Sequence, residues 1–96
     1  MEGPNMPTNG SRKHLPRITV FTSPSCHWCT VAKRYLTEKG LTYREVDVIT
    51  DVKGRQEMVR MTRQYGVPVI RVGEDAMVGW DKAEFERLLS GRLEQR

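Results

Sequence analysis

Two cysteines separated by two residues, placed between a strand-like run and a helical pattern, constrain this chain more than any other feature. Cys26 and Cys29 are its only cysteines, which is too few for the disulfide scaffold of a small secreted domain. A pair at this spacing can be half of a zinc site, a redox dithiol, or two buried side chains without chemistry. The choice depends on the residues around it.

Those residues predict a strand followed at once by a helix. Ile18–Thr22 is a short run of β-branched and aromatic residues, typical of a strand buried on both faces. Ser23-Pro24-Ser25 ends this strand. From Trp28 onward the apolar residues recur at the spacing of one helical face, and Gly40 is expected to end the helix. The residues on that face are Trp28, Val31, Ala32, Tyr35 and Leu36.

Two strands, a hairpin and two more helices are expected downstream. The predicted elements are a strand over Leu41–Val48, a helix from Asp51 to Gly66, a strand over Val67–Val72, a partner strand over Ala76–Val78 after a turn at 73–75, and a helix after Asp81. Gly54 weakens the first turn of the second helix, and Met58, Met61 and Tyr65 are expected in the core, as is Tyr35. The last helix is expected to begin with a capping box of Asp81 and Glu84 and to bury Phe85, Leu88 and Leu89.

This β-α-β-α-β-β-α order predicts an α/β domain with a four-stranded mixed sheet and three helices. A right-handed crossover gives a parallel pair of strands, the hairpin is antiparallel, and helices cover both faces. With 96 residues the chain is long enough for one core and too short for two. The domain is expected over residues 17–96, after a flexible N-terminal tail at 1–16 that is rich in Pro, Gly and Asn.

Composition excludes several classes of function. Sixteen Lys and Arg against twelve Asp and Glu give a net charge of +4 without a basic block, which is a weak signal for nucleic acid. The apolar runs fall far short of the roughly 20 residues that cross a bilayer. Because the N-terminal stretch is unlike a secretory signal, we expect a cytoplasmic monomer that binds neither membrane nor nucleic acid.

The predicted position of the cysteines favours redox chemistry. Cys26 falls at the N-terminal edge of the helix, where unpaired backbone N–H groups and the helix dipole stabilise a thiolate. Cys29 lies one turn further in and deeper, yet within reach of Cys26. Cys26 is therefore expected to attack a substrate disulfide, and Cys29 to resolve the mixed disulfide and leave an internal Cys26–Cys29 disulfide.

A metal site is the alternative interpretation. A structural zinc ion takes four ligands, and besides the two cysteines the chain offers only His14, in the tail, and His27, badly placed between them. An iron–sulfur or zinc carrier that shares its metal through Cys26 in a dimer stays open and predicts metal in the purified protein. Two inert cysteines are disfavoured, because a helix N-terminus is a poor place to bury a thiol.

Three segments together resemble a glutaredoxin-like redoxin of the thioredoxin superfamily. They are VFTSPSCHWC at 20–29, GVPV at 66–69 and VGWD at 78–81, and the resemblance extends over residues 17–90. It implies a thioredoxin fold and a dithiol disulfide reductase without a bound cofactor. It also implies a cis peptide bond before Pro68, beside the two sulfurs, with the Val67 backbone pairing with a substrate strand.

Two departures from the family pattern bear on the electron donor. Glutathione-using glutaredoxins usually have a Lys three residues before the first Cys and a Pro directly after it, where this chain has Ser23 and His27. The chain is thus more similar to NrdH-redoxins, which take electrons from thioredoxin reductase and so indirectly from NADPH. A glutathione-type thiol is the other donor considered. Asp81 matches the first acidic residue of the family's glutathione-contacting turn, but it also fits a helix cap.

The remaining candidates are residues expected to contact a protein substrate. His27 either brings positive charge to the sulfur or is simply solvated, and Trp28 either flanks the dithiol at the surface or packs in the core. Trp80 is expected as half-exposed apolar surface. The full substrate-binding set is His27, Trp28, Val67, Pro68, Gly79, Trp80 and Asp81.

Overall fold

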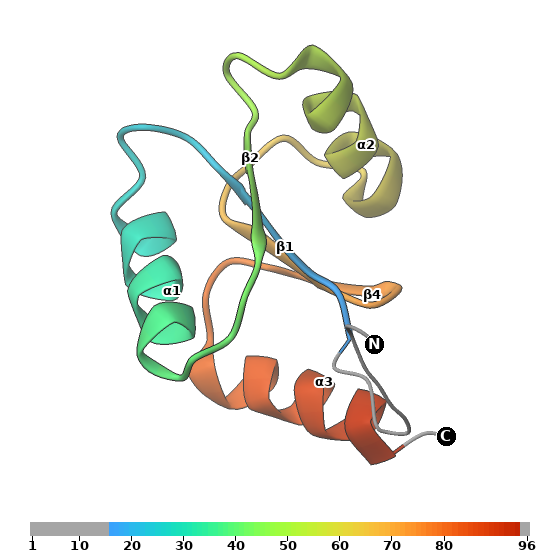
Figure 1. Cartoon of the computed structure of the whole chain (residues 1–96). Helices are drawn as coiled ribbons and strands as arrows, with labels where there is room; N and C mark the ends of the chain where they lie inside the picture. Colours follow the sequence, from blue (N-terminus) through green and yellow to red (C-terminus); the bar gives the residue numbers. More distant parts are fainter. Residues whose placement is uncertain (1–15, 95–96) are drawn as a thin grey trace, which may run out of the picture.

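The structure is a computed structural model and describes residues 16–94; the N-terminal tail predicted at 1–16 lies, apart from its last residue, outside them. Seven elements follow in the predicted order: β1 (Ile18–Thr22), α1 (His27–Glu38), β2 (Arg44–Asp47), α2 (Val52–Thr62), β3 (Val69–Val72), β4 (Asp75–Val78) and α3 (Lys82–Glu94) (Figure 1). Among these residues no helix combines the length and apolar character that a membrane span requires.

The four strands form one mixed sheet in the order β2-β1-β3-β4. β1 is central: it pairs in parallel with β2, with Phe21 opposite Val46, and antiparallel with β3, with Phe21 opposite Val69. β4 returns from β3 as an antiparallel hairpin. The predicted parallel crossover and terminal hairpin are both confirmed.

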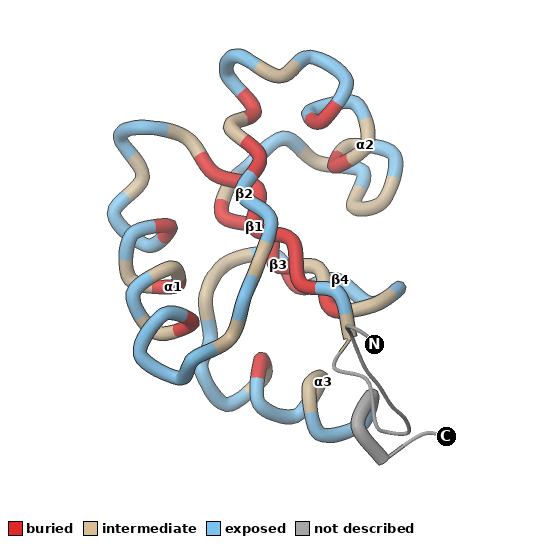
Figure 2. Tube along the Cα trace, in the orientation of Figure 1, coloured by how far each residue is buried: buried red, intermediate tan, exposed pale blue. Residues whose placement is uncertain are grey.

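Helices cover both faces of the sheet, and each face has its own core. α1 and α3 pack on one face over a cluster of buried residues, namely Ile18, Val20, Ala32, Leu36, Ile70, Val72, Met77 and Phe85. α2 packs on the other face over a smaller cluster, formed by Phe21, Val46, Val48, Met58 and Val69. The sheet separates α2 from the other two helices in Figure 1, and the buried segments in Figure 2 follow the central strands.

The first helix begins and ends near its predicted limits. Cys26 is its N-cap, and Gly40, with a φ of 73°, follows its C-terminus. Its fully buried stripe is Cys29, Ala32 and Leu36. The predicted apolar face therefore turns slightly away from Trp28, which stays at the surface.

The second helix begins as predicted but ends four residues before Gly66. The Asp51 carboxylate caps it by accepting a hydrogen bond from the Gly54 N–H at 2.8 Å. Arg63 then adopts a left-handed conformation with a φ of 59° and ends it. Tyr65 consequently lies outside the helix with 74% of its surface exposed, so its predicted place in the core is wrong.

The last helix is capped by Asp81, whose carboxylate accepts hydrogen bonds from the N–H groups of Ala83 and Glu84 at 3.0 and 3.2 Å. The Glu84 side chain pairs with Arg87 instead of completing the predicted capping box. Phe85 is fully buried, and Leu88 and Leu89 pack half-buried against the same cluster. α3 is thereby anchored on the face that also holds α1.

Candidate active site

β1 delivers the chain directly to the N-terminal end of α1, where the two cysteines lie. The Cys26 N–H donates to the Ser23 carbonyl at 3.3 Å, which closes the turn between strand and helix. Cys26 then serves as the N-cap, and its sulfur accepts a hydrogen bond from the Cys29 N–H at 3.2 Å. The first turn of α1 has no acidic residue. This environment favours negative charge on the Cys26 sulfur.

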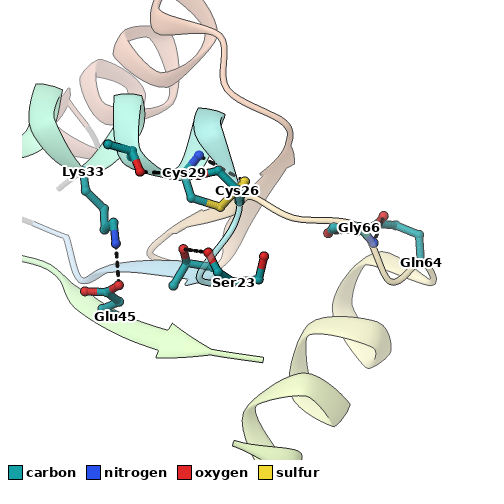
Figure 3. The surroundings of a disulfide bond; sticks show 9 residues. Ser23, Cys26, Cys29, Lys33, Glu45, Gln64 and Gly66 are labelled. Atoms are coloured by element: carbon teal, nitrogen blue, oxygen red, sulfur yellow. Dashed lines mark hydrogen bonds and ion pairs between the residues drawn. A yellow bond between two sulfur atoms is a disulfide. The ribbon is translucent and has the colours of Figure 1, made fainter. Parts of the chain in front are cut away.

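The two sulfurs are joined in a disulfide, with Cα atoms 5.2 Å apart (Figure 3). Cys26 is partly exposed, whereas Cys29 is 1% exposed and belongs to the buried stripe of α1. The predicted difference in accessibility is thus confirmed. Only the Cys26 sulfur is open to an approaching substrate.

The two residues between the cysteines project from the first turn into solvent. His27 is exposed, and Trp28 is 56% exposed. Their rings meet edge to face with centroids 5.2 Å apart. Of the two interpretations of Trp28, the structure supports the surface one, so an aromatic platform lies beside the partly exposed sulfur.

Val67 and Pro68 lie at the same edge of the sheet as the cysteine turn. Because Val69 pairs with Phe21, the residues just before β3 lie next to those just after β1. The Val67–Pro68 bond is cis, as the family resemblance implied. The Pro68 carbonyl accepts a hydrogen bond from the Gly79 N–H at 2.8 Å, which ties this segment to the end of β4.

The segment before Pro68 contains a local hydrogen-bond network that the sequence did not suggest. The Gln64 side chain accepts from the Gly66 N–H at 2.6 Å and donates to the Gly66 carbonyl at 3.0 Å. Figure 3 shows this segment leading toward the disulfide. No motif marks such a bridge, since it depends on a turn that only the structure reveals.

The two other predicted contact residues have structural partners. Trp80 is half-buried, and its ring packs 5.3 Å from Tyr35 and 5.6 Å from Phe85, centroid to centroid. Its intermediate burial agrees with the expectation of a half-exposed ring, and its contact with a substrate beside the dithiol stays a prediction. Asp81 is exposed but caps α3 with one carboxylate oxygen.

Tyr35 links α1 to α3 at the base of this aromatic group. Its hydroxyl donates to the Glu86 carboxylate. This hydrogen bond, followed by burial, raises the pKa of Tyr35 to about 12. The pair fixes the helix that bears the cysteines against the helix that follows Trp80.

Among residues 16–94 no group of three or more His, Cys, Asp or Glu side chains is gathered; a metal shared through Cys26 between two chains stays a prediction. His14, one of the considered ligands, lies outside the described residues. His27 stands exposed on the first turn beside the disulfide.

Comparison with known proteins agrees with this geometry. The Glutaredoxin family model matches residues 18–77, a range that includes both cysteines and the cis-proline. An uncharacterized glutaredoxin-like 8.6 kDa protein in the rubredoxin operon of Clostridium pasteurianum is 39% identical over 72 residues, or 75% of this chain and 96% of that protein. A glutaredoxin of Neisseria meningitidis is 34% identical over 67 residues, or 69% and 79% of the two chains.

Solved structures show the same architecture. A thioredoxin-like protein with 26% identity superposes with a TM-score of 0.71 over 76% of this chain and 100% of its own. The glutaredoxin-like NrdH-redoxin of Escherichia coli, whose structure is described as the basis of a thioredoxin-like activity profile, has 25% identity and a TM-score of 0.65 over 75% and 93%. The fold is the thioredoxin fold that the sequence resemblance implied.

Proposed function

Because the chain belongs to the glutaredoxin family, we propose that it is a thiol–disulfide oxidoreductase that reduces protein disulfides through Cys26 and Cys29. One observation carries the proposal: two sulfurs at disulfide distance at a helix N-terminus, one partly exposed and hydrogen-bonded, the other buried. A pair with this asymmetry can attack with one sulfur and resolve with the other.

The reaction begins with the reduced form. The Cys26 thiolate attacks one sulfur of the substrate disulfide, so that a Cys26–substrate bond forms while the substrate bond breaks and its second sulfur leaves as a thiolate. Cys29 loses its proton and attacks the Cys26 sulfur, which releases the other substrate thiolate. The substrate gains two electrons and two protons, and the Cys26–Cys29 disulfide remains.

The order of attack follows from the surroundings of each sulfur. Charge on the Cys26 sulfur is stabilised by the Cys29 N–H and the helix N-terminus. Cys29 is buried at 1% exposure, so it reaches only the Cys26 sulfur, after that sulfur has bound the substrate. Because Cys29 lies one helix turn from Cys26, it resolves the mixed disulfide within the same molecule.

The proposed substrate platform surrounds Cys26. Within the described part of the chain, no hydrogen bond engages the backbone N–H or C=O of Val67, which leaves both free to pair with an extended substrate segment. Trp28 offers an exposed apolar surface on the same helix turn as Cys26. His27, Pro68 and Gly79 complete the platform. Trp80 and Asp81 contribute through their packing and capping positions.

The proposed electron donor is a thioredoxin-reductase-type flavoprotein that uses NADPH. Ser23 and His27 stand where glutathione-using glutaredoxins usually have Lys and Pro, so a cation for a glutathione carboxylate is missing at Ser23. The likeness to the NrdH-redoxin of Escherichia coli, a glutaredoxin-like protein with a thioredoxin-like activity profile, supports the same donor. A glutathione-type thiol is the alternative that the assay separates.

The test compares the two donors with the same disulfide-containing protein substrate. One reaction contains NADPH and thioredoxin reductase, and the other contains NADPH, glutathione reductase and glutathione. We expect turnover with thioredoxin reductase that disappears in Cys26→Ser, while Cys29→Ser accumulates a mixed disulfide detectable by mass spectrometry. Turnover only with glutathione would overturn the donor, and no turnover with either would overturn the reductase and require metal analysis of the purified protein.

A further inference from the structure

A pocket lies at the end of the sheet remote from the cysteines. It has a volume of about 640 Å³ and is lined by residues at the start of β1, the segment before β2, and the hairpin after β3. Cys26 follows the other end of β1. The pocket is therefore separate from the redox site, and its volume falls within the roughly 300–1,000 Å³ of ligand-binding cavities.

The strand register gathers three arginines in this pocket. Thr19 of β1 lies opposite Arg44 of β2 on one side and Arg71 of β3 on the other. Residues paired across strands project from the same face of a sheet, and so do residues two apart on one strand. Arg17, two residues before Thr19, thus joins the same wall. This is the α2 face, because Glu57 of α2 contacts Arg71.

Positive charge exceeds negative charge in this wall. Arg71 donates to the Glu57 carboxylate at 2.8 Å and to the Gly73 carbonyl at 2.9 Å, which holds its guanidinium in place. For residues 16–94, Arg17 and Arg44 make no ion pair. Three cations against one carboxylate leave a net charge of +2. Like charges on neighbouring strands repel each other, so an anion between them relieves a cost already present in the fold.

Thr19 adds a neutral donor between the arginines. The residue is 6% exposed and lines the pocket, and its hydroxyl has no hydrogen-bond partner in the part of the chain that the structure describes. Buried hydroxyl groups are normally hydrogen-bonded, because an unpaired one has lost its hydrogen bonds to water without replacement. An oxygen of a ligand held by the flanking guanidinium groups would satisfy it.

We propose that this pocket binds a small ligand that carries a doubly charged oxyanion group, such as a phosphate ester. Guanidinium groups bind phosphate and carboxylate oxygens through parallel, charge-assisted hydrogen bonds. Arg44 and Arg17 supply exposed positive charge, Arg71 supplies a donor held by two hydrogen bonds, and Thr19 supplies the hydroxyl between the strands. Leu41 and Tyr43 also line the pocket, although their side chains pack against the α1/α3 cluster. The site goes beyond the redox function and does not depend on it.

The test is titration of the full ¹⁵N-labelled chain with pyrophosphate, followed by amide chemical shifts at constant ionic strength. We expect saturable shifts centred on Thr19, Arg44 and Arg71. Arg44→Gln should weaken binding at least tenfold, and Thr19→Val about threefold. Arg34→Gln removes the same charge from an exposed position on α1 and should change affinity less than twofold. A parallel titration with malonate tests whether a dicarboxylate substitutes for phosphate.

Each alternative result is decisive. Shifts that do not saturate, or an equal loss in Arg34→Gln and Arg44→Gln, would overturn the site in favour of general attraction to a basic protein. Arg17→Gln, outside the strands, repeats the test if Arg44→Gln disturbs the sheet. Disulfide reduction should be unchanged in all of these variants, so failure of this proposal and failure of the redox function are distinguished by separate assays.

Discussion

One face of the sheet is covered by two helices and the other by a single helix, and the two faces differ in what they leave exposed. On the first, α1 and α3 enclose the larger buried cluster, and the cysteines lie at the N-terminal end of α1. On the second, α2 covers the smaller cluster around Phe21 and Val69. Toward the start of β1, arginine side chains line this face instead. Two helices thus cover the face against which the cysteine-bearing helix packs, and the single helix on the other face leaves a charged pocket uncovered.

The largest expected difference between the faces is in core truncation. Phe85→Ala removes a fully buried ring that packs against both Tyr35 and Trp80. It should lower the free energy of unfolding by about 3–5 kcal/mol. Met58→Ala, the matched change under α2, should cost about 2–3 kcal/mol, near the lower end for such changes, because the smaller cluster can relax more easily. Urea unfolding of the oxidised proteins measures both.

An equal or larger loss in Met58→Ala would break this comparison. The α2 face would then be as tightly packed as the α1/α3 face, despite its smaller cluster. Far-UV circular dichroism of each variant, recorded before unfolding, shows that a native fold is being compared.

The next effect concerns how closely α2 approaches the sheet. A Cβ added at Gly54 would lie 2.3 Å from Val46 Cγ1, so Gly54→Ala forces the helix away from β2. Overpacking of this kind costs about 1–3 kcal/mol, more than the roughly 1 kcal/mol that alanine gains in a helix. Gly91→Ala in α3 meets no atom within 4 Å and should stabilise by about 0.5–1 kcal/mol. Thermal unfolding of the two variants should shift in opposite directions; stabilisation by Gly54→Ala would refute the close approach.

A smaller effect, on the other face, depends on pH. Tyr35 has a pKa raised to about 12, first by its hydrogen bond to Glu86 and then by burial. A raised pKa means that this stabilisation is complete below pH 10 and is lost as the pH rises toward 12. Tyr35→Phe should therefore cost at most about 1 kcal/mol at pH 8, because solvent reaches the pair.

The difference between wild type and Tyr35→Phe should shrink from pH 10 to pH 12. Unfolding curves over pH 8–11.5 measure it. Tyr65→Phe is the matched control, since that ring is 74% exposed, and its stability difference from wild type should be near zero throughout. A Tyr35→Phe difference that stays constant with pH would show that the hydroxyl does not donate to Glu86.

The strand and helix order was predictable because it rests on local patterns. Alternating and helical apolar spacings located every element, and the cap at Asp81 was predicted from the residue type at the start of the last helix. The end of α2 was not, because Arg63 adopts a left-handed conformation that favours glycine or asparagine in sequence statistics. That one residue also moved Tyr65 from the expected core to the surface.

The candidate site was predictable to the extent that it is local. Cys26 and Cys29 lie on one helix turn, so their spacing alone implied proximity and unequal burial. The ring contacts of Trp80 with Tyr35 and Phe85 were not predictable, because they are tertiary contacts that no sequence spacing encodes. Gly54 was read as a weak helix residue, whereas its real constraint is contact with a strand. The arginine pocket depends on register between three strands and was not visible at all.

The smallest expected effect comes from the two ion pairs that join a helix to the sheet, one on each face. Lys33 of α1 pairs with Glu45 of β2 at 2.6 Å, as Figure 3 shows, and Glu57 of α2 pairs with Arg71 of β3 at 2.8 Å. Exposed pairs couple by roughly 0.2–1 kcal/mol. Glu45 is 44% exposed, whereas neither partner of the second pair exceeds 32%.

The Glu57–Arg71 pair should therefore show the larger coupling in double-mutant cycles with glutamine substitutions. Arg71 also donates to the Gly73 carbonyl, so less side-chain entropy is lost when its planar guanidinium meets Glu57. Both couplings should fall in 1 M NaCl, the Lys33–Glu45 coupling more completely, because solvent ions reach it more easily. A larger coupling for the Lys33–Glu45 pair would contradict this prediction. It would mean that Arg71, on the face covered by one helix, is not the more firmly held of the two cations.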